Sequence, residues 1–151
     1  MTTIAYDGRY IVADGLCKMD STIVSDSVEK FYYRDDLMFA LCGTTQHCHE
    51  FANDFEALKS PSNKYLDAGG FLFENEEVFL VFVCPDNNVF VKNRMIGDIW
   101  ADGSGRDWAI AAMDHGKTAI EAVQYAATRD IGTGGQLKCF DTHTKKFIKV
   151  K

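Results

Sequence analysis

The sequence lacks the features that would direct a protein to a membrane, a nucleic acid or an export pathway. Among its 151 residues no apolar run approaches the roughly 18 residues that a membrane-spanning helix needs. The amino terminus has no basic segment followed by an apolar one, so we expect no signal peptide. The net charge of −6, with no basic cluster to offset it, disfavours nucleic-acid binding. We therefore expect a cytoplasmic protein that binds neither membranes nor nucleic acids.

The chain also lacks the cysteine spacing of a disulfide framework or a zinc site. Its five cysteines are scattered and odd in number, which indicates reduced thiols that lie mostly in the core. Cys-x-x-Cys is absent, and His47 and His49, close to Cys42 and Cys48, would point to different sides of a helix. We expect neither a metal nor a cofactor.

Repeats, low-complexity segments and linkers are absent as well, so we expect a single domain over residues 1–151. Strand signals cover residues 4–13, 28–33, 37–42, 77–84, 88–92, 95–101, 136–141 and 146–150. Residues 16–20 are expected to continue or pair with the first hairpin, and residues 21–26 to form a polar connection. The strands on either side of residues 85–87 are expected to form a hairpin. Helices are expected over 44–59, 106–114 and 118–129, the first with an apolar stripe of Cys48, Phe51, Phe55 and Leu58 and the second with Trp108, Ala111 and Ala112 inward. Runs of strands alternate with runs of helices. This order predicts an α+β fold, a four-layer αββα sandwich of two mainly antiparallel sheets with outer helices.

The amino terminus carries the first chemical signal. If Met1 is removed, Thr2 becomes the first residue and carries a hydroxyl nucleophile beside its own α-amine. An α-amine has a reference pKa near 7.7–8.0, so it can accept the hydroxyl proton at neutral pH. Many chains begin with Met-Thr for no chemical reason, and the dipeptide alone does not establish a function.

Six short segments, each weak alone, occur in a consistent order at the expected junctions of strands and helices. They are Thr2-Thr3-Ile4, Ala13-Asp14-Gly15, Val28-Glu29-Lys30-Phe31, Ala40-Leu41-Cys42-Gly43, Asp102-Gly103-Ser104-Gly105 and Arg129-Asp130-Ile131-Gly132-Thr133-Gly134-Gly135. In these segments the chain resembles the N-terminal-nucleophile hydrolases, and among them the proteasome β-subunits and the bacterial HslV peptidase. The resemblance implies an enzyme, a threonine-type peptidase or amide hydrolase.

The resemblance also implies a role for each site residue. Thr2 would be the nucleophile, Lys30, on a strand, would lower its pKa by nearby charge, and Asp14 would anchor Lys30. Gly43 would give its backbone N–H to the oxyanion, and Ser104 would relay the proton of the Thr2 amine. Asp130 and Thr133 would hold Ser104 and the amine.

Each of these residues also has an ordinary structural interpretation. Lys30 could be a surface lysine, Ala13-Asp14-Gly15 a turn, and Gly43 a glycine at a helix start. Ser104 could be a helix N-cap, Asp130 a helix C-terminal residue and Thr133 part of a turn. The sequence leaves both interpretations open.

The partners follow from the resemblance, with one departure from the family. Only one helix fits between Gly43 and Glu77, where proteasome-type subunits carry a pair, which leaves less surface for docking an ATPase. Phe71, Phe73 and Phe79 are expected to be exposed there and to form an interface. We expect a peptide or protein substrate and a homo-oligomer, with a ring as the implied form. The alternatives are a catalytically silent structural or assembly subunit and an amidase for small molecules.

Overall fold

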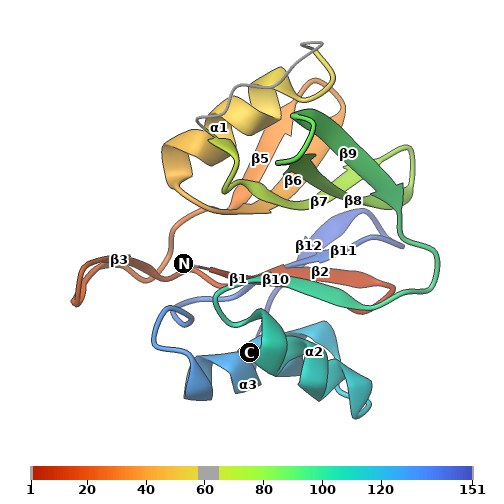
Figure 1. Cartoon of the computed structure of the whole chain (residues 1–151). Coiled ribbons are helices and arrows are strands. Elements are labelled where there is room, and N and C mark those ends of the chain that lie inside the picture. The colour runs from red at the N-terminus through yellow and green to blue at the C-terminus, as the bar shows by residue number, and fades with distance from the viewer. Residues whose placement is uncertain (1, 58–64, 151) are drawn as a thin grey trace.

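The computed structural model describes residues 2–57 and 65–150, which form a mixed α+β structure (Figure 1). The helices are α1 (Thr45–Asp54), α2 (Arg106–Asp114) and α3 (Ala119–Arg129). The strands are β1 (Thr3–Tyr6), β2 (Tyr10–Ala13), β3 (Cys17–Met19), β4 (Thr22–Ser25), β5 (Phe31–Arg34), β6 (Leu37–Cys42), β7 (Gly69–Glu74), β8 (Glu77–Cys84), β9 (Val89–Arg94), β10 (Trp100–Gly103), β11 (Lys138–Asp141) and β12 (Lys146–Ile148).

The strands form two five-stranded sheets and one two-stranded sheet. One large sheet has the order β10-β1-β2-β11-β12, so it joins the beginning of the chain to its end. The other is a meander, β5-β6-β7-β8-β9. Every strand pairing is antiparallel, as the alternation of strand and helix runs predicted.

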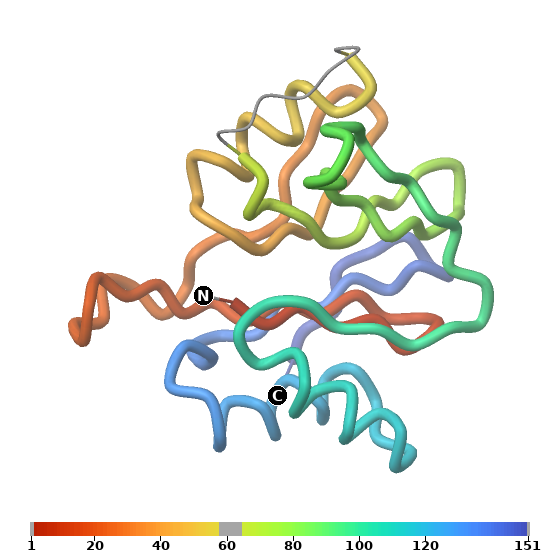
Figure 2. Tube along the Cα trace, viewed as in Figure 1, coloured from red at the N-terminus to blue at the C-terminus, as the bar shows by residue number. Residues whose placement is uncertain are grey.

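The prediction of two sheets was wrong, because β3 and β4 form a third sheet of their own. The segment was expected to continue the first hairpin and then to become a polar connection. It instead turns back on itself and projects from the two larger sheets (Figure 2). Met19, Ile23 and Val24 on this hairpin are exposed. Among the described residues, β3 and β4 pair only with each other.

Buried side chains pack in three clusters. One lies between α1 and the β5–β9 sheet, one between the two large sheets, and one between the other large sheet and the helices α2 and α3. Phe39 and Leu41 of β6 pack with α1 on one side, whereas Ala40 faces the other sheet. Ile4 of β1 joins the cluster between the sheets, and Ala5 packs towards α2 and α3. Successive residues of a strand point to opposite faces, so both large sheets are covered on both sides. Figure 1 shows α1, the two sheets, and the pair α2 and α3 in that order.

Helix α1 confirms the apolar stripe, since Cys48, Phe51 and Phe55 are buried. The helix ends at Asp54, earlier than predicted, and Leu58 lies outside the described residues. Strand β10 also begins later than expected, at Trp100. None of the helices in the described ranges is long and apolar enough to cross a membrane.

The inward orientation predicted for Trp108 and Ala111 was wrong, whereas Ala112 is partly buried as predicted. Trp108 is exposed and meets Tyr125 of α3 edge-on, with ring centroids 6.5 Å apart. Ala109 and Met113 are the buried residues of α2 instead. Helices α2 and α3 pack on the sheet through small side chains, and a bulky indole at that contact would hold the backbones apart.

The aromatic residues expected at an exposed interface lie inside the molecule. Phe71 is fully buried between the two large sheets, and Phe73 is partly buried against the same cluster. Phe79 is partly buried beside α1. These residues therefore give no support to an oligomer interface at this place.

All five cysteines are free thiols, and Cys42, Cys48 and Cys139 are buried, as the sequence predicted for core thiols. Burial raises the pKa of both Cys48 and Cys139 to about 12. A thiol with so high a pKa is a poor nucleophile at neutral pH, because the thiolate is the reactive form. Among the described residues, no group of three or more His, Cys, Asp or Glu side chains is placed to hold a metal ion.

Candidate functional site

Thr2 lies directly before β1, a strand in the interior of its sheet. It is only 3% exposed. β1 pairs with β10 on one side and with β2 on the other, so the strand that follows Thr2 is held on both edges. The amide of Ser104 donates to the carbonyl of Thr2 at 2.8 Å. The backbone of Thr2 is therefore held by the junction between β10 and α2.

Thr2 lines a cavity of about 330 Å³ together with Lys30 and Gly43. These residues come from three separate segments of the chain, so the fold assembles the cavity. The remaining lining residues are Leu16, Cys17, Lys18, Val28, Tyr32, Leu41, Thr44, Thr45 and Asp67. Apolar side chains thus supply part of the wall and polar ones the rest, a composition typical of a binding site for a small group.

Lys30 points its ammonium at a buried carboxylate. Its Nζ donates to Asp14 Oδ1 at 2.7 Å and to the carbonyl of Leu16 at 2.9 Å. The Lys30 side chain is 6% exposed and that of Asp14 is fully buried, so Lys30 is not a surface lysine. The residue precedes β5 rather than lying on a strand as predicted. Its carbonyl nevertheless accepts from the amide of Leu41 at 3.1 Å, which ties it to β6.

Asp14 follows β2 and accepts hydrogen bonds from three segments. Its Oδ1 takes the amide of Thr3 at 3.0 Å besides the ammonium of Lys30. Its Oδ2 accepts from the amide of Gly134 at 3.0 Å. Hydrogen bonds to a charged acceptor are stronger than neutral ones, so this carboxylate holds Lys30 and the start of β1 in one geometry.

Ser104, Asp130 and Thr133 form a second network that contacts the backbone of Thr2. The hydroxyls of Ser104 and Thr133 both donate to Asp130 Oδ2 at 2.6 Å. Burial acts to raise the pKa of Asp130, but these two hydrogen bonds and one from the amide of Gly132 outweigh it and lower the pKa overall. Asp130 is therefore a carboxylate at neutral pH. It is also the C-cap residue of α3, whereas the N-cap of α2 is Gly105 and not Ser104.

Gly43 follows β6 and turns the chain towards α1. Its φ of +128° lies in a region that side chains disfavour, and a Cβ there would stand 2.7 Å from the carbonyl oxygen of Asp67. The residue at this point of the cavity wall must therefore be glycine. The Asp67 carboxylate accepts from the amide and hydroxyl of Thr44 at 3.0 and 2.9 Å, and it contacts His47 Nδ1 at 2.7 Å.

The structure thus brings all seven predicted site residues into one region. Thr2, Lys30 and Gly43 line the cavity, and Asp14 binds Lys30. The other three, Ser104, Asp130 and Thr133, form the second network, which reaches Thr2 through the Ser104 amide. Residue 1 lies outside the described residues, so the removal of Met1 stays a prediction.

Sequence reasoning missed Thr3, Asp67 and the backbone groups of Leu16 and Gly134. Thr3 could have been found from the sequence. It shares a strand face with Ala5, which packs against helices, and a buried polar side chain on that face needs a hydrogen-bond partner. Leu16 contributes only its backbone carbonyl and Gly134 only its backbone amide, groups that almost every residue possesses. Their participation depends on chain geometry alone.

A scan against protein-family models and a search of curated proteins found no match for this chain.

Proposed function

We propose that the chain is an N-terminal-nucleophile hydrolase that cleaves peptides or other amides, with Thr2 as the nucleophile once Met1 has been removed. In this proposal the helices and the two large sheets make the four-layer αββα sandwich of that class, and the hairpin of β3 and β4 is an addition beside the cavity. The resemblance of the six sequence segments supports both parts of the proposal.

The observation that carries the proposal is the buried ion pair of Lys30 and Asp14 beside Thr2. Taking two charges out of water costs free energy, and a pair of apolar side chains of similar volume is often at least as stable. A buried lysine in a cavity wall is therefore poorly explained by stability alone. A fixed positive charge next to a hydroxyl lowers the pKa of that hydroxyl, which is what a nucleophilic threonine needs.

The chemistry would proceed in two halves. The Thr2 Oγ attacks the carbonyl carbon of the amide while the free α-amine of Thr2 takes the hydroxyl proton. The C–N bond then breaks, the leaving amine takes up that proton, and an ester joins Thr2 to the acyl group. Water next attacks the ester with the α-amine as the base, which releases the carboxylic acid and restores the threonine.

The remaining residues would support these steps. The backbone N–H of Gly43 would donate to the oxyanion that forms at each attack, where a glycine lets the substrate approach closely. Ser104 and Thr133, both bound to Asp130, would hold the α-amine in place. The cavity beside Thr2 would receive a side chain or a small group of the substrate.

We also propose a homo-oligomer. This proposal rests on the resemblance alone. The interface was expected at Phe71, Phe73 and Phe79, and these residues lie inside the molecule. A lower dependence on an ATPase partner, expected because only one helix fits between Gly43 and Glu77, stays a proposal. The cytoplasmic location stays an expectation from the composition of the sequence.

The test combines intact-mass spectrometry with a peptide epoxyketone. The mass of protein expressed in cells shows whether Thr2 is the first residue. The epoxyketone offers one electrophilic carbon to the hydroxyl and another to the amine, so a stable adduct requires both groups at one residue. We expect one adduct on the wild-type chain and none on Thr2→Ala.

Thr3→Ala is not a suitable control because Thr3 contacts the site, so Thr22→Ala on the exposed β4 serves instead and should label like the wild type. Equal labelling of wild type and Thr2→Ala would overturn Thr2 as the nucleophile. A wild-type chain that has lost Met1 and still forms no adduct, with boronate probes as well, would favour the silent structural subunit.

A further inference from the structure

Thr3 is fully buried and uses both its backbone and its side chain in hydrogen bonds with the two networks. Its amide donates to Asp14 Oδ1 at 3.0 Å, the same oxygen that binds Lys30. Its hydroxyl lies 2.6 Å from the hydroxyl of Thr133. Thr3 therefore contacts Asp14 directly and reaches Asp130 through Thr133.

The direction of the hydroxyl contact follows from the neighbouring acceptor. Thr133 Oγ1 donates its one hydrogen to Asp130 Oδ2, and the lowered pKa of Asp130 keeps that carboxylate an acceptor. Thr133 therefore accepts from Thr3. The chain of donors runs from Thr3 to Thr133 to Asp130, and the Ser104 hydroxyl donates to the same oxygen of Asp130.

The space around this hydroxyl pair is closely fitted. A Cβ on Gly105 would lie 2.2 Å from Thr3 Oγ1 and 2.8 Å from Thr133 Oγ1. Neither hydroxyl could keep its place beside a larger residue at position 105. Glycine at the start of α2 is thus a requirement of the hydroxyl pair.

We propose that Thr3 is a positioning residue that locks the Lys30–Asp14 pair and the Ser104–Asp130–Thr133 network into one frame around Thr2. This inference rests on the proposed function. Through its amide Thr3 fixes the carboxylate that orients Lys30, and through its hydroxyl it fixes the groups that would hold the α-amine. A small displacement of one reacting group relative to another can lower a rate by about a hundredfold.

Thr3 does not line the cavity, so its hydroxyl acts on the reaction and not on the fit of the ligand. Loss of the hydroxyl should lower the limiting rate of covalent labelling while the half-saturating concentration stays the same. A side chain that merely supported the fold would change the fraction of folded protein and leave the rate of the folded fraction unaltered.

The experiment uses the peptide epoxyketone that labels the wild type. It measures the limiting rate of labelling and the half-saturating concentration for Thr3→Val, Thr3→Ala and Thr3→Ser. We expect a fall of about tenfold or more in the limiting rate for Thr3→Val, and restoration of most of it in Thr3→Ser, which keeps the donor. Thr3→Ala, which adds no bulk, replaces Thr3→Val if the valine variant fails to fold. Thr142→Val is the matched control, since it removes a buried hydroxyl that donates to the Arg9 carbonyl at 2.5 Å, away from the cavity.

A double-mutant cycle of Thr3→Val and Thr133→Val gives a second readout. If the two hydroxyls act through one chain of hydrogen bonds, the double variant should label little more slowly than the slower of the two single variants. Equal limiting rates for wild type and folded Thr3→Val, or a Thr3→Ser variant as slow as Thr3→Val, would overturn the role of Thr3 and leave the nucleophile assigned. A wild-type chain without an adduct on Thr2 would overturn both proposals.

Discussion

Asp14 is a buried carboxylate whose two oxygens accept from the ammonium of Lys30 and from the amides of Thr3 and Gly134. Its contacts explain why the ion pair tolerates burial, because the hydrogen bonds to two amides offset part of the lost hydration. If Lys30 is removed, Asp14 keeps both amide donors. If Asp14 is removed, the Leu16 carbonyl is the remaining partner of Lys30 among the described residues, and the buried charge has lost its counter-charge. The two residues are therefore unequal partners in stability, although both serve the same proposed chemistry.

Lys30→Ala should keep the fold and slow the labelling of Thr2 by about a hundredfold to a thousandfold, the range for loss of one electrostatic donor at an active site. Circular dichroism and the rate of epoxyketone labelling measure the two effects separately. Lys18→Ala is the control, because Lys18 lines the same cavity and the variant makes the same change in net charge. Labelling at the wild-type rate in Lys30→Ala would show that the charge has no part in the chemistry.

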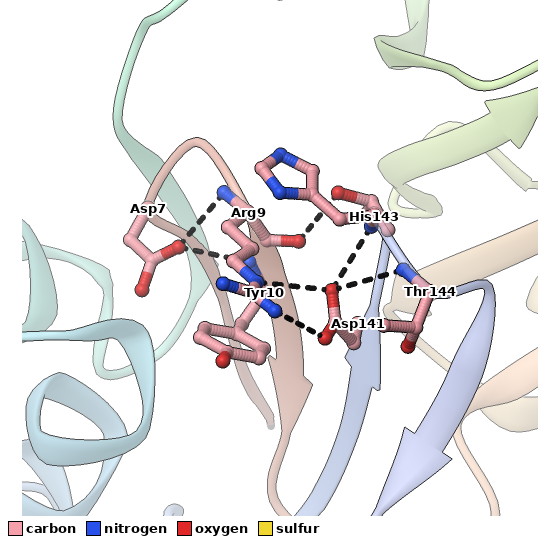
Figure 3. A network of polar contacts seen from close by, with 7 residues as sticks. Asp7, Arg9, Tyr10, Asp141, His143 and Thr144 are labelled. Atoms are coloured by element: carbon pink, nitrogen blue, oxygen red, sulfur yellow. Dashed lines mark hydrogen bonds and ion pairs between the residues drawn. The ribbon is translucent and has the colours of Figure 1, made fainter.

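Helix α3 is the element that carries Asp130 to the site, and its other end is anchored twice. Thr118 and Glu121 form a reciprocal capping box at its N-terminus. The turn between β1 and β2 adds a second anchor, because Asp7 Oδ2 accepts from the amide of Ala119 at 2.9 Å. The same Asp7 accepts from the amides of Arg9 and Tyr10 within its own turn (Figure 3). One side chain thus shapes the first hairpin and attaches it to α3.

Thr118→Ala should lower the free energy of unfolding by about 1 kcal/mol, the usual cost of losing an N-cap hydroxyl. The capping box lies at the end of α3 opposite Asp130, so the rate of Thr2 labelling should stay at the wild-type value. Urea unfolding and labelling kinetics on the same preparation measure both quantities. A large fall in labelling without a change in stability would mean that the capped end of α3 affects the site directly.

For the molecule as a whole, the first and last hairpins are joined by Arg9 and Asp141. The guanidinium donates to both carboxylate oxygens, at 3.1 Å from Nε and 2.9 Å from Nη2 (Figure 3). The amide of His143 donates to the same carboxylate at 2.9 Å. The hydrogen bond from Arg9 is the main cause that holds the pKa of Asp141 well below its ordinary value. Neither residue lines the cavity beside Thr2, so we expect this contact to act on stability.

The depressed pKa of Asp141 sets the pH range in which it stabilises the fold. The contribution is complete above the pKa of an unfolded aspartate, near 3.9, and is lost as the pH falls below about 4 towards the folded value. Asp141→Asn should therefore be less stable than the wild type at pH 5 and above, and the difference should shrink below pH 4. Urea midpoints at a series of pH values test this. A difference that stays constant down to pH 2 would contradict it.

Much of the fold was predictable because it is encoded locally. The spacing of Cys48, Phe51 and Phe55 predicted α1, and the strand signals around residues 85–87 predicted the hairpin of β8 and β9. The six segments contained the seven site residues that the structure brings together, although Lys30 precedes β5 instead of lying on a strand. Trp108 was misjudged because helical spacing alone does not show which face meets a sheet.

The sequence by itself determined the α+β class and the antiparallel pairing, because short-range periodicity carries that information, and the resemblance of its six segments supplied the residues of the candidate site. Only the tertiary structure decided that β3 and β4 stand apart as a third sheet, since pairing depends on which strands lie within reach. It also decided the partners of Asp14. Thr3 and Gly134 reach that carboxylate through backbone amides, from 11 and 120 residues away along the chain. A backbone amide is the same in almost every residue, so its role is set by its position in the folded chain.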